Sequence, residues 1–218
     1  MQAMSSVNLQ SEAVNYWNDP IGSIKENSHI LGSGKWGSRD KWQAIGDGHL
    51  KMFLNFDCKK GSMIEWGCGG GSNALAFSKI FDKVTGIDIS KQSLKACDVL
   101  EIDNFEGVLL DVEVSGQYDF FLSTATFQHF TSKEYGENIV KKAHDILKPN
   151  ALAMIQTRYD NGDERFIQKY KDYKNNAITF TSYKIDEFWG LLDDSGFDVE
   201  SVILEPQANY AYYFARVK

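Results

Sequence analysis

The residues with the clearest chemical potential lie at positions 64–73, where the sequence reads IEWGCGGGSN. Glu65 closes an apolar run, and four glycines then fall within the five residues 67–71. Glycine permits backbone conformations that other residues avoid, and it lets a ligand approach the main chain closely. Asp88 follows a second apolar run, nineteen residues after Gly69. Two carboxylates beside a bare turn can accept hydrogen bonds from a cationic group or from sugar hydroxyls.

The elements that must position these residues alternate along the chain from about residue 62. Short apolar runs predict five strands, at residues 62–67, 83–89, 106–112, 118–125 and 151–157. Apolar residues at helical spacing predict helices between them, at residues 72–81, 91–100 and 132–147. Ser90 is a candidate N-cap of the second helix, and Lys148-Pro149-Asn150 is a candidate stop of the third. Strands and helices that alternate at this length imply parallel pairing, and hence an open α/β sheet.

The two ends of the chain depart from that rhythm. The C-terminal sequence predicts, in order, a helix and the two strands of an antiparallel hairpin, at residues 184–197, 198–206 and 209–218. Residues 1–50 and 157–183 instead mix aromatic and polar side chains without a clear period. We therefore expect one domain over residues 1–218, in which 1–50 form an N-terminal cap and 157–183 a substrate-side insertion over the ligand edge of the sheet.

The glycine-rich turn suits two ligands, because open α/β sheets bind ligands beyond the carboxyl ends of their strands. A dinucleotide is recognised by G-x-G-x-x-G/A, which residues 69–74 satisfy loosely. S-adenosylmethionine is bound by an acidic strand residue followed by G-x-G-x-G, which residues 65–71 match in register. Glu65 separates the two ligands, because a carboxylate repels a pyrophosphate but tolerates a ligand that carries an ammonium and a sulfonium group.

Together with Asp88 and the run ILKPNA at residues 146–151, these motifs resemble those of class I S-adenosylmethionine-dependent methyltransferases over about residues 60–155. The resemblance implies S-adenosylmethionine as the cofactor. It also implies a Rossmann-like open sheet that is mostly parallel with an antiparallel C-terminal hairpin strand, helices on both faces and an N-terminal helical cap. Asn150-Ala151 stand where the family usually has two glycines, a mild departure because Asn also accepts the turn geometry.

The resemblance carries cofactor-binding roles onto individual residues. Asp88 is expected to hold the ribose hydroxyls and Ile89 to pack on the adenine. Asp111 and the N–H group of Val112 are expected at the adenine ring, and Ser123 near the methionine moiety. An exposed loop aspartate would look the same as Asp111. The cofactor loop itself is expected to consist of Glu65, Gly67, Cys68, Gly69 and Gly71, in which Cys68 serves as a small apolar side chain.

Two residues are candidates for the chemistry of methyl transfer. His129 follows the fourth strand and titrates near neutrality, so it suits a general base or a group that orients the acceptor. Its alternative role is to hydrogen-bond the backbone at a helix entry. Arg158 ends the fifth strand and suits a carboxylate or phosphate of the acceptor; its alternative is a salt bridge within residues 157–183. His49 and Trp42 either shield the cofactor or pack the cap.

Composition restricts the class of protein. The net charge of −7 disfavours a nucleic-acid partner, because phosphate binding draws on basic residues. The three cysteines have no framework spacing, and the potential ligands have no metal-site spacing. No apolar run approaches the roughly 20 residues needed to cross a bilayer. We therefore expect a cytoplasmic monomer or homodimer with a small-molecule acceptor, and no metal, membrane or nucleic-acid partner.

The main hypothesis is the transfer of a methyl group from S-adenosylmethionine to an oxygen or nitrogen of a small metabolite by in-line displacement. Two alternatives remain. A nicotinamide-dependent oxidoreductase would use the same turn for a dinucleotide, and Glu65 weighs against it. A non-catalytic, methyltransferase-like scaffold subunit would have no physical reason to retain both Glu65 and Asp88.

Overall fold

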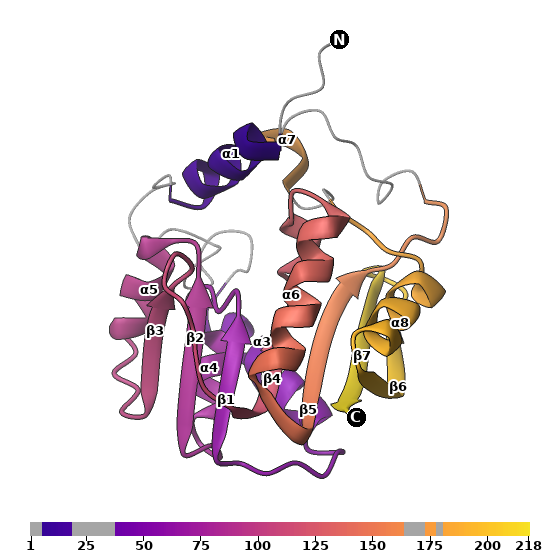
Figure 1. Cartoon of the computed structure of the whole chain (residues 1–218). Helices are drawn as coiled ribbons and strands as arrows, with labels where there is room; N and C mark the ends of the chain where they lie inside the picture. The colour runs from indigo at the N-terminus through magenta and orange to yellow at the C-terminus, as the bar shows by residue number, and fades with distance from the viewer. Residues whose placement is uncertain (1–5, 19–37, 164–172, 178–180) are drawn as a thin grey trace. The chain divides into compact units, whose positions relative to one another are not determined.

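The structure is a computed structural model of the whole chain, and it describes residues 6–18, 38–163, 173–177 and 181–218 (Figure 1). The predicted cap at 1–50 and the predicted insertion at 157–183 therefore lie partly outside the described residues. Within the described ranges, no helix combines the length and the apolar character that crossing a membrane requires.

Seven strands form one sheet in the order β3-β2-β1-β4-β5-β7-β6. Their bounds are β1 Ser62–Trp66, β2 Lys83–Asp88, β3 Phe105–Leu109, β4 Tyr118–Ser123, β5 Leu147–Arg158, β6 Phe197–Glu205 and β7 Tyr210–Val217. Strand β1 pairs in parallel with β2 and β4, and β2 pairs in parallel with β3. Strand β7 pairs antiparallel with both β5 and β6. The predicted open, mostly parallel sheet with an antiparallel C-terminal hairpin is confirmed.

The helices of the described residues are α1 Ser6–Asn18, α3 Arg39–Phe53, α4 Ser72–Phe77, α5 Lys91–Asp98, η2 Phe127–His129 (a 3₁₀ turn), α6 Lys133–Ile146, α7 Tyr173–Asn176 and α8 Ile185–Asp194. The four helices predicted by residue range are present with shorter bounds, as α4, α5, α6 and α8, and the described residues form further helices besides them. Ser90 caps α5 as predicted, because its side chain accepts a hydrogen bond from the Ser93 N–H. Asn150 has the expected left-handed backbone with φ 62°, although α6 ends earlier, at Ile146, and Pro149 lies in β5.

The chain divides into two compact units, which are described separately. The glycine unit comprises Trp17–Leu122, and the hairpin unit comprises Met1–Tyr16 with Ser123–Lys218. In the glycine unit, α3 and α4 lie together behind β1 and β2 in the view of Figure 1. Aromatic side chains of these helices and of β4 form its core: between centroids, the ring of Phe53 lies 5.5 Å from Phe77 of α4 and 4.5 Å from Phe120 of β4. Burial of such large rings stabilises the layer that supports the glycine-rich turn.

In the hairpin unit, α6 and α8 lie on one face of the three strands β5, β7 and β6 (Figure 1). Phe188 of α8 packs its ring 4.8 Å from Tyr213 of β7 and 5.0 Å from Tyr183. The Tyr213 hydroxyl donates to the Ile185 carbonyl oxygen at 3.3 Å. Helix α8 is thereby fixed to the hairpin by its apolar side, as its helical spacing predicts.

Candidate functional site

The glycine-rich turn joins β1 to α4, and three of its glycines have a left-handed backbone. The φ angles of Gly67, Gly69 and Gly71 are 79°, 53° and 87°, a region that L-residues with side chains rarely adopt. The N–H groups of Gly67 and Cys68 both donate to the Ile87 carbonyl oxygen, at 2.8 and 2.9 Å. A Cβ added to Gly69 would meet no atom within 4 Å. The turn is thus tied to the end of β2, and its backbone at Gly69 faces open space.

Asp88 closes this turn from the end of β2. Its Oδ2 accepts from the Gly69 N–H at 2.8 Å, and its Oδ1 accepts from the Ser90 N–H at 2.8 Å. Burial raises the pKa of Asp88 to about 6, while these backbone N–H groups oppose the rise. Each carboxylate oxygen has more than one lone pair, so Asp88 can still accept from sugar hydroxyls.

Glu65 is the most deeply buried acid of the site, with 1% of its side chain exposed. Its Oε1 accepts from the Asn73 side-chain amide at 2.6 Å, whereas its Oε2 is buried and has no hydrogen-bond partner among the described residues. The Asn73 Oδ1 lies 2.8 Å from the Nδ1 of His49 in α3. Burial raises the pKa of Glu65 to about 8, the Asn73 hydrogen bond opposes this, and the charge of Asp88 adds to it. An unpartnered buried carboxyl oxygen is costly unless a ligand completes it.

The side chain of Cys68, within the turn, packs against Gly86 of β2. It is buried, its Sγ would lie 2.8 Å from a Cβ on Gly86, and it adjoins Cys97, whose Sγ donates to the Gly69 carbonyl oxygen at 3.3 Å. The hydrogen bond with Cys97 and burial raise the pKa of the Cys68 thiol. The thiol is therefore neutral and packs as the small apolar side chain that the sequence predicts.

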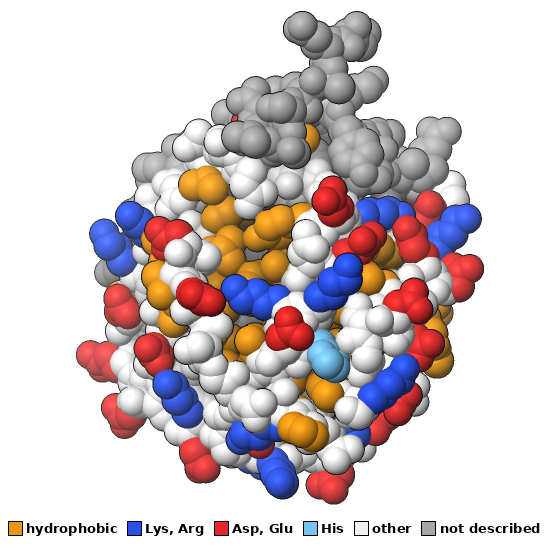
Figure 2. Space-filling model, viewed as in Figure 1, with side chains coloured by type: hydrophobic (Ala, Val, Ile, Leu, Met, Phe, Trp, Pro, Cys, Tyr) orange, Lys and Arg blue, Asp and Glu red, His pale blue; other side chains and the backbone are white. Residues whose placement is uncertain are grey.

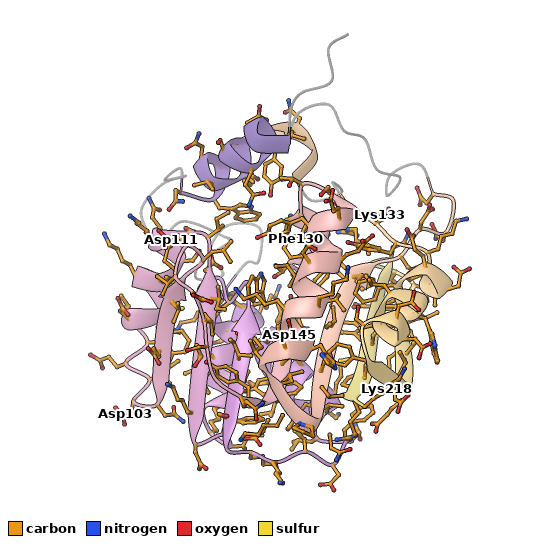
Figure 3. The ribbon with its side chains drawn as sticks, viewed as in Figure 1. Asp103, Asp111, Phe130, Lys133, Asp145 and Lys218 are labelled. Carbon is orange, nitrogen blue, oxygen red and sulfur yellow. The ribbon has the colours of Figure 1, made fainter. Side chains whose placement is uncertain are left out.

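The predicted adenine-side residues follow β2 and β3 in the glycine unit. Asp111 is exposed and lies just beyond the carboxyl end of β3 (Figure 3). Val112 is 54% exposed, but its N–H donates to the Leu109 carbonyl oxygen at 2.9 Å. The expectation that this N–H points toward a ligand ring is therefore wrong for this structure, because a local turn uses it.

Two asparagines that sequence reasoning missed belong to the same site. Asn18 donates from Nδ2 to the Ile89 carbonyl oxygen at 3.2 Å, and its Oδ1 accepts from the Lys91 N–H at 3.0 Å. The chain near residue 18 is thus held to the segment after β2. Asn73 bridges Glu65 and His49. Asn73 could have been found from the sequence, because it lies in the first turn of the helix that follows the glycines. Asn18 could not, because its partners lie more than 70 residues away and leave no local sequence signal.

The remaining predicted site residues, Ser123, His129 and Arg158, belong to the hairpin unit. Ser123 ends β4 and is buried. Two residues later, Ala125 has a left-handed backbone with φ 53°, and its N–H donates to the Gln156 side-chain oxygen. Gln156 in turn donates to the Tyr212 hydroxyl at 2.8 Å. A side chain of β5 therefore holds the loop that follows β4 in an uncommon conformation.

His129 ends the 3₁₀ turn η2. Its Nδ1 must be the donor toward the Ala177 carbonyl oxygen, because a carbonyl only accepts. Its Nε2 then accepts at 3.3 Å from the Gln128 amide, a long contact. The Tyr173 hydroxyl donates to the His129 carbonyl oxygen at 2.8 Å. Of the two roles left open by the sequence, the backbone contact is present, and the neutral tautomer keeps Nε2 as the basic nitrogen.

Arg158 is 7% exposed, and its guanidinium is held by the hairpin. Nη1 donates to the Ala208 carbonyl oxygen at 2.8 Å, Nη2 donates to the Tyr210 hydroxyl at 3.1 Å, and the group lies 4.6 Å from the Tyr210 ring centroid. Burial lowers the pKa of Arg158, and Tyr210 opposes this. The arginine thus fastens the β6–β7 turn.

The chemistry of the glycine unit fits a particular kind of ligand. A buried carboxyl oxygen without a partner suits a cationic group, and Asp88 beside the open backbone of Gly69 suits hydroxyl groups. Glu65 disfavours a pyrophosphate, whereas Asp88 would suit the ribose of either kind of ligand. In the described part of the chain, no three His, Cys, Asp or Glu side chains come together in a way that could hold a metal ion.

Comparisons with known proteins agree with this geometry. A family model for a methyltransferase domain matches residues 39–202. A malonyl-[acyl-carrier protein] O-methyltransferase of Priestia megaterium is 30% identical over 118 residues. That alignment covers 51% of this chain but only 42% of the relative.

Solved structures share the fold at low sequence identity. A magnesium protoporphyrin IX methyltransferase from Synechocystis PCC 6803, with bound SAH, superimposes with a TM-score of 0.70 and 16% identity, over 96% of this chain and all (100%) of that one. A 1,6-didemethyltoxoflavin-N1-methyltransferase from Burkholderia thailandensis gives a TM-score of 0.68 and 15% identity, over 100% of this chain and 92% of that one.

Proposed function

The chain belongs to the methyltransferase domain family, and we propose that it transfers a methyl group from S-adenosylmethionine to an oxygen or nitrogen atom of a small molecule. One observation supports the choice of cofactor. Glu65 presents a buried oxygen without a described partner beside the glycine-rich turn, where Asp88 accepts the Gly69 N–H and open space lies next to the Gly69 backbone. S-adenosylmethionine combines an ammonium, a sulfonium and two ribose hydroxyls. Those groups complement the two acids of this turn.

The residues of the glycine unit hold the cofactor and leave the chemistry to it. When bound, S-adenosylmethionine supplies an activated methyl group and a neutral leaving thioether. Asp88 accepts hydrogen bonds from the ribose hydroxyls, and Glu65 receives the ammonium. Gly67, Gly69 and Gly71 carry no side chain that would keep the cofactor away from the backbone. Ile89 offers an apolar surface to the adenine. The protein accelerates the reaction by alignment and by exclusion of water.

On the acceptor side, His129 is proposed to accept a proton at Nε2 or to orient the acceptor, since its Nδ1 is committed to Ala177. Ser123, at the end of β4, is proposed to contact the methionine moiety. Arg158 is proposed to attract an anionic group of the acceptor. Of the three similar proteins named above, one is an O-methyltransferase and another an N1-methyltransferase, which supports both acceptor atoms.

The setting of the protein is also a proposal. Cys68 and Cys97 adjoin each other as free thiols, which favours a reducing, cytoplasmic compartment. Acidic and basic side chains are intermixed over the described surface seen in Figure 2, which with the net charge of −7 disfavours a nucleic-acid partner. A monomer or homodimer remains the expected assembly.

Ligand titration tests the proposal. We expect S-adenosylhomocysteine to bind in calorimetry and, at about 100 times its Kd, to stabilise the protein by about 2.7 kcal/mol, or roughly 5–10 °C in Tm. NAD⁺ is the matched comparison, because it carries the same adenosine on a pyrophosphate. Binding of NAD⁺ with no response to S-adenosylhomocysteine would instead support an oxidoreductase. Donor binding without turnover of any carboxylate, hydroxyl or amine acceptor would support the scaffold alternative.

A further inference from the structure

Helix α3 presents one side to the start of α4. Its buried residues Trp42, Gly46, His49 and Phe53 recur at helical spacing. Phe53 packs into the aromatic core, with its ring 4.5 Å from Phe120 between centroids. The other three lie along the same side and contact the two residues that follow the glycine-rich turn. The helix is therefore docked on the turn.

Ser72 makes this docking close. Its Oγ accepts from the Gly46 N–H at 3.1 Å and donates to the Trp42 carbonyl oxygen at 2.9 Å, so one hydroxyl bridges two backbone groups of α3. A Cβ on Gly46 would lie 2.2 Å from the Ser72 carbonyl oxygen. Only glycine permits this approach, and it brings His49, three residues further along, to Asn73.

The contacts from His49 to Glu65 have one direction. The Asn73 amide donates from Nδ2 to Glu65 Oε1 at 2.6 Å, so its Oδ1 faces His49 and accepts from the Nδ1–H at 2.8 Å. His49, Asn73 and Glu65 are 7%, 6% and 1% exposed, so water does not substitute freely for either bond. With the Glu65 proton on Oε2 and the His49 proton on Nδ1, a flipped Asn73 amide would place N–H against N–H at His49 and oxygen against oxygen at Glu65, so the arrangement seen satisfies every one of these groups.

We propose that His49 is a positioning residue for the donor site: through Asn73 it holds Glu65 by one oxygen and leaves the other to receive the ammonium group of the bound cofactor. This inference rests on the proposed function and deepens it. In this role His49 acts on the donor site through Asn73 and not by direct contact with the cofactor. Its role is to keep the buried carboxyl in one orientation, so that recognition of the ammonium does not have to reorganise the site.

Two other titratable groups, Asp88 and Cys68, interact with this carboxyl. Burial, with a smaller contribution from Asp88, raises the pKa of Glu65 to about 8, so the ligand-free carboxyl is largely protonated at pH 7. Cys68 adjoins the same acids as a neutral thiol. Arrival of an ammonium reverses this balance, because the opposite charge favours the ionised carboxylate. Binding is therefore expected to release up to one proton from Glu65.

The test compares two ligands that differ only at the ammonium: S-adenosylhomocysteine and its deaminated analogue. We expect the wild-type protein to prefer S-adenosylhomocysteine by about tenfold or more. His49→Phe keeps a ring but removes the N–H, and it should reduce that preference to about threefold or less. His49→Asn places an amide nitrogen near the position of Nδ1 and should retain most of the preference. Lys51→Ala, on the exposed side of α3, is the matched control and should behave as the wild type.

The preference is a ratio measured on one variant, so a general loss of packing would weaken both ligands and leave it unchanged. A wild-type preference retained by His49→Phe, or lost equally in His49→Asn, overturns the positioning role. Equal binding of the two ligands by the wild type overturns it too, while leaving the proposed function intact. Failure of the wild type to bind either ligand contradicts the proposed function itself.

Should His49→Phe fail to fold, nitrogen NMR of the wild-type imidazole decides the matter. We expect a protonated Nδ1 at pH 7 whose resonance shifts with S-adenosylhomocysteine and not with the deaminated analogue. A resonance that ignores both ligands, or responds equally to both, overturns the proposal.

Discussion

The glycine-rich turn and the acceptor-side residues are built in different ways. In the turn, the left-handed glycines, Glu65 and Asp88 lie within 24 residues of one another, and their contacts are largely to backbone or to neighbours in the same motif. His129 and Arg158 are instead held by carbonyl oxygens 48 and 50 residues away. Local geometry therefore predominates at the proposed donor side, whereas long-range packing predominates at the proposed acceptor side. A family can keep the first while it varies the second.

The sharpest test of this contrast is at His129. Asn in place of His129 preserves an N–H near the position of Nδ1, and with it the bond to Ala177, but removes Nε2. If Nε2 is the base, kcat falls about 100-fold or more while the melting temperature changes little. Steady-state kinetics with an acceptor that supports turnover, together with thermal unfolding, measures both. Full activity in this variant would assign His129 a purely structural role.

Asp88→Ala examines the donor side. It removes the acceptor of the Gly69 and Ser90 N–H groups as well as the proposed ribose contact. We expect the affinity for S-adenosylhomocysteine to fall by about 1–3 kcal/mol, roughly 5- to 150-fold. Calorimetry at fixed salt gives the value, and Asp111→Ala serves as a comparison at an exposed site. Unchanged affinity in Asp88→Ala would contradict the assignment of Asp88.

The two acids also predict how stability depends on pH. Burial raises the pKa of Glu65 from 4.5 to about 8 and that of Asp88 from 3.8 to about 6. The folded state therefore holds more protons than the unfolded state between pH 4 and 8, and the unfolding free energy of the ligand-free protein falls as pH rises through this range.

Between pH 6 and 8 the fall is due mainly to Glu65, whose contribution is expected to be about 2 kcal/mol. Glu65→Gln cannot ionise and should remove this contribution, leaving only the smaller decrease from Asp88, which is nearly complete by pH 7. Urea unfolding of both proteins at pH 6, 7 and 8 compares the slopes. A wild-type protein that becomes more stable toward pH 8 would show that Glu65 is already ionised in the ligand-free state.

The smallest expected effect is at Arg158. Arg158→Gln removes the bonds to Ala208 and Tyr210 and should destabilise the hairpin unit by about 1 kcal/mol. Donor affinity should stay the same, while the KM for an anionic acceptor should rise. Arg216→Gln is the control, since that arginine also joins strands of this unit but pairs with Glu200 at an exposed site. Equal kinetic behaviour of the two variants would limit Arg158 to its structural contacts.

The same contrast between local and long-range contacts explains which features could be predicted from the sequence. The mostly parallel sheet with its antiparallel C-terminal hairpin, the capped α5 and the acids beside the glycines follow from periodicity and local chemistry, and all are present. Gly46 has no local reason to be glycine, because its constraint is the Ser72 carbonyl oxygen 26 residues ahead. Asn18, likewise, is defined by partners more than 70 residues away. The error at Val112 has the opposite origin: a local turn captured an N–H that the family resemblance assigned to a ligand.

A crystal structure of the protein with S-adenosylhomocysteine tests the central claim most directly. The account predicts the ribose hydroxyls within hydrogen-bond distance of the Asp88 carboxylate, and the ammonium at the Glu65 oxygen that now has no partner, with Asn73 still bridging His49 and Glu65. A ligand bound elsewhere, or an ammonium turned away from Glu65 with that oxygen still unpartnered, would contradict it.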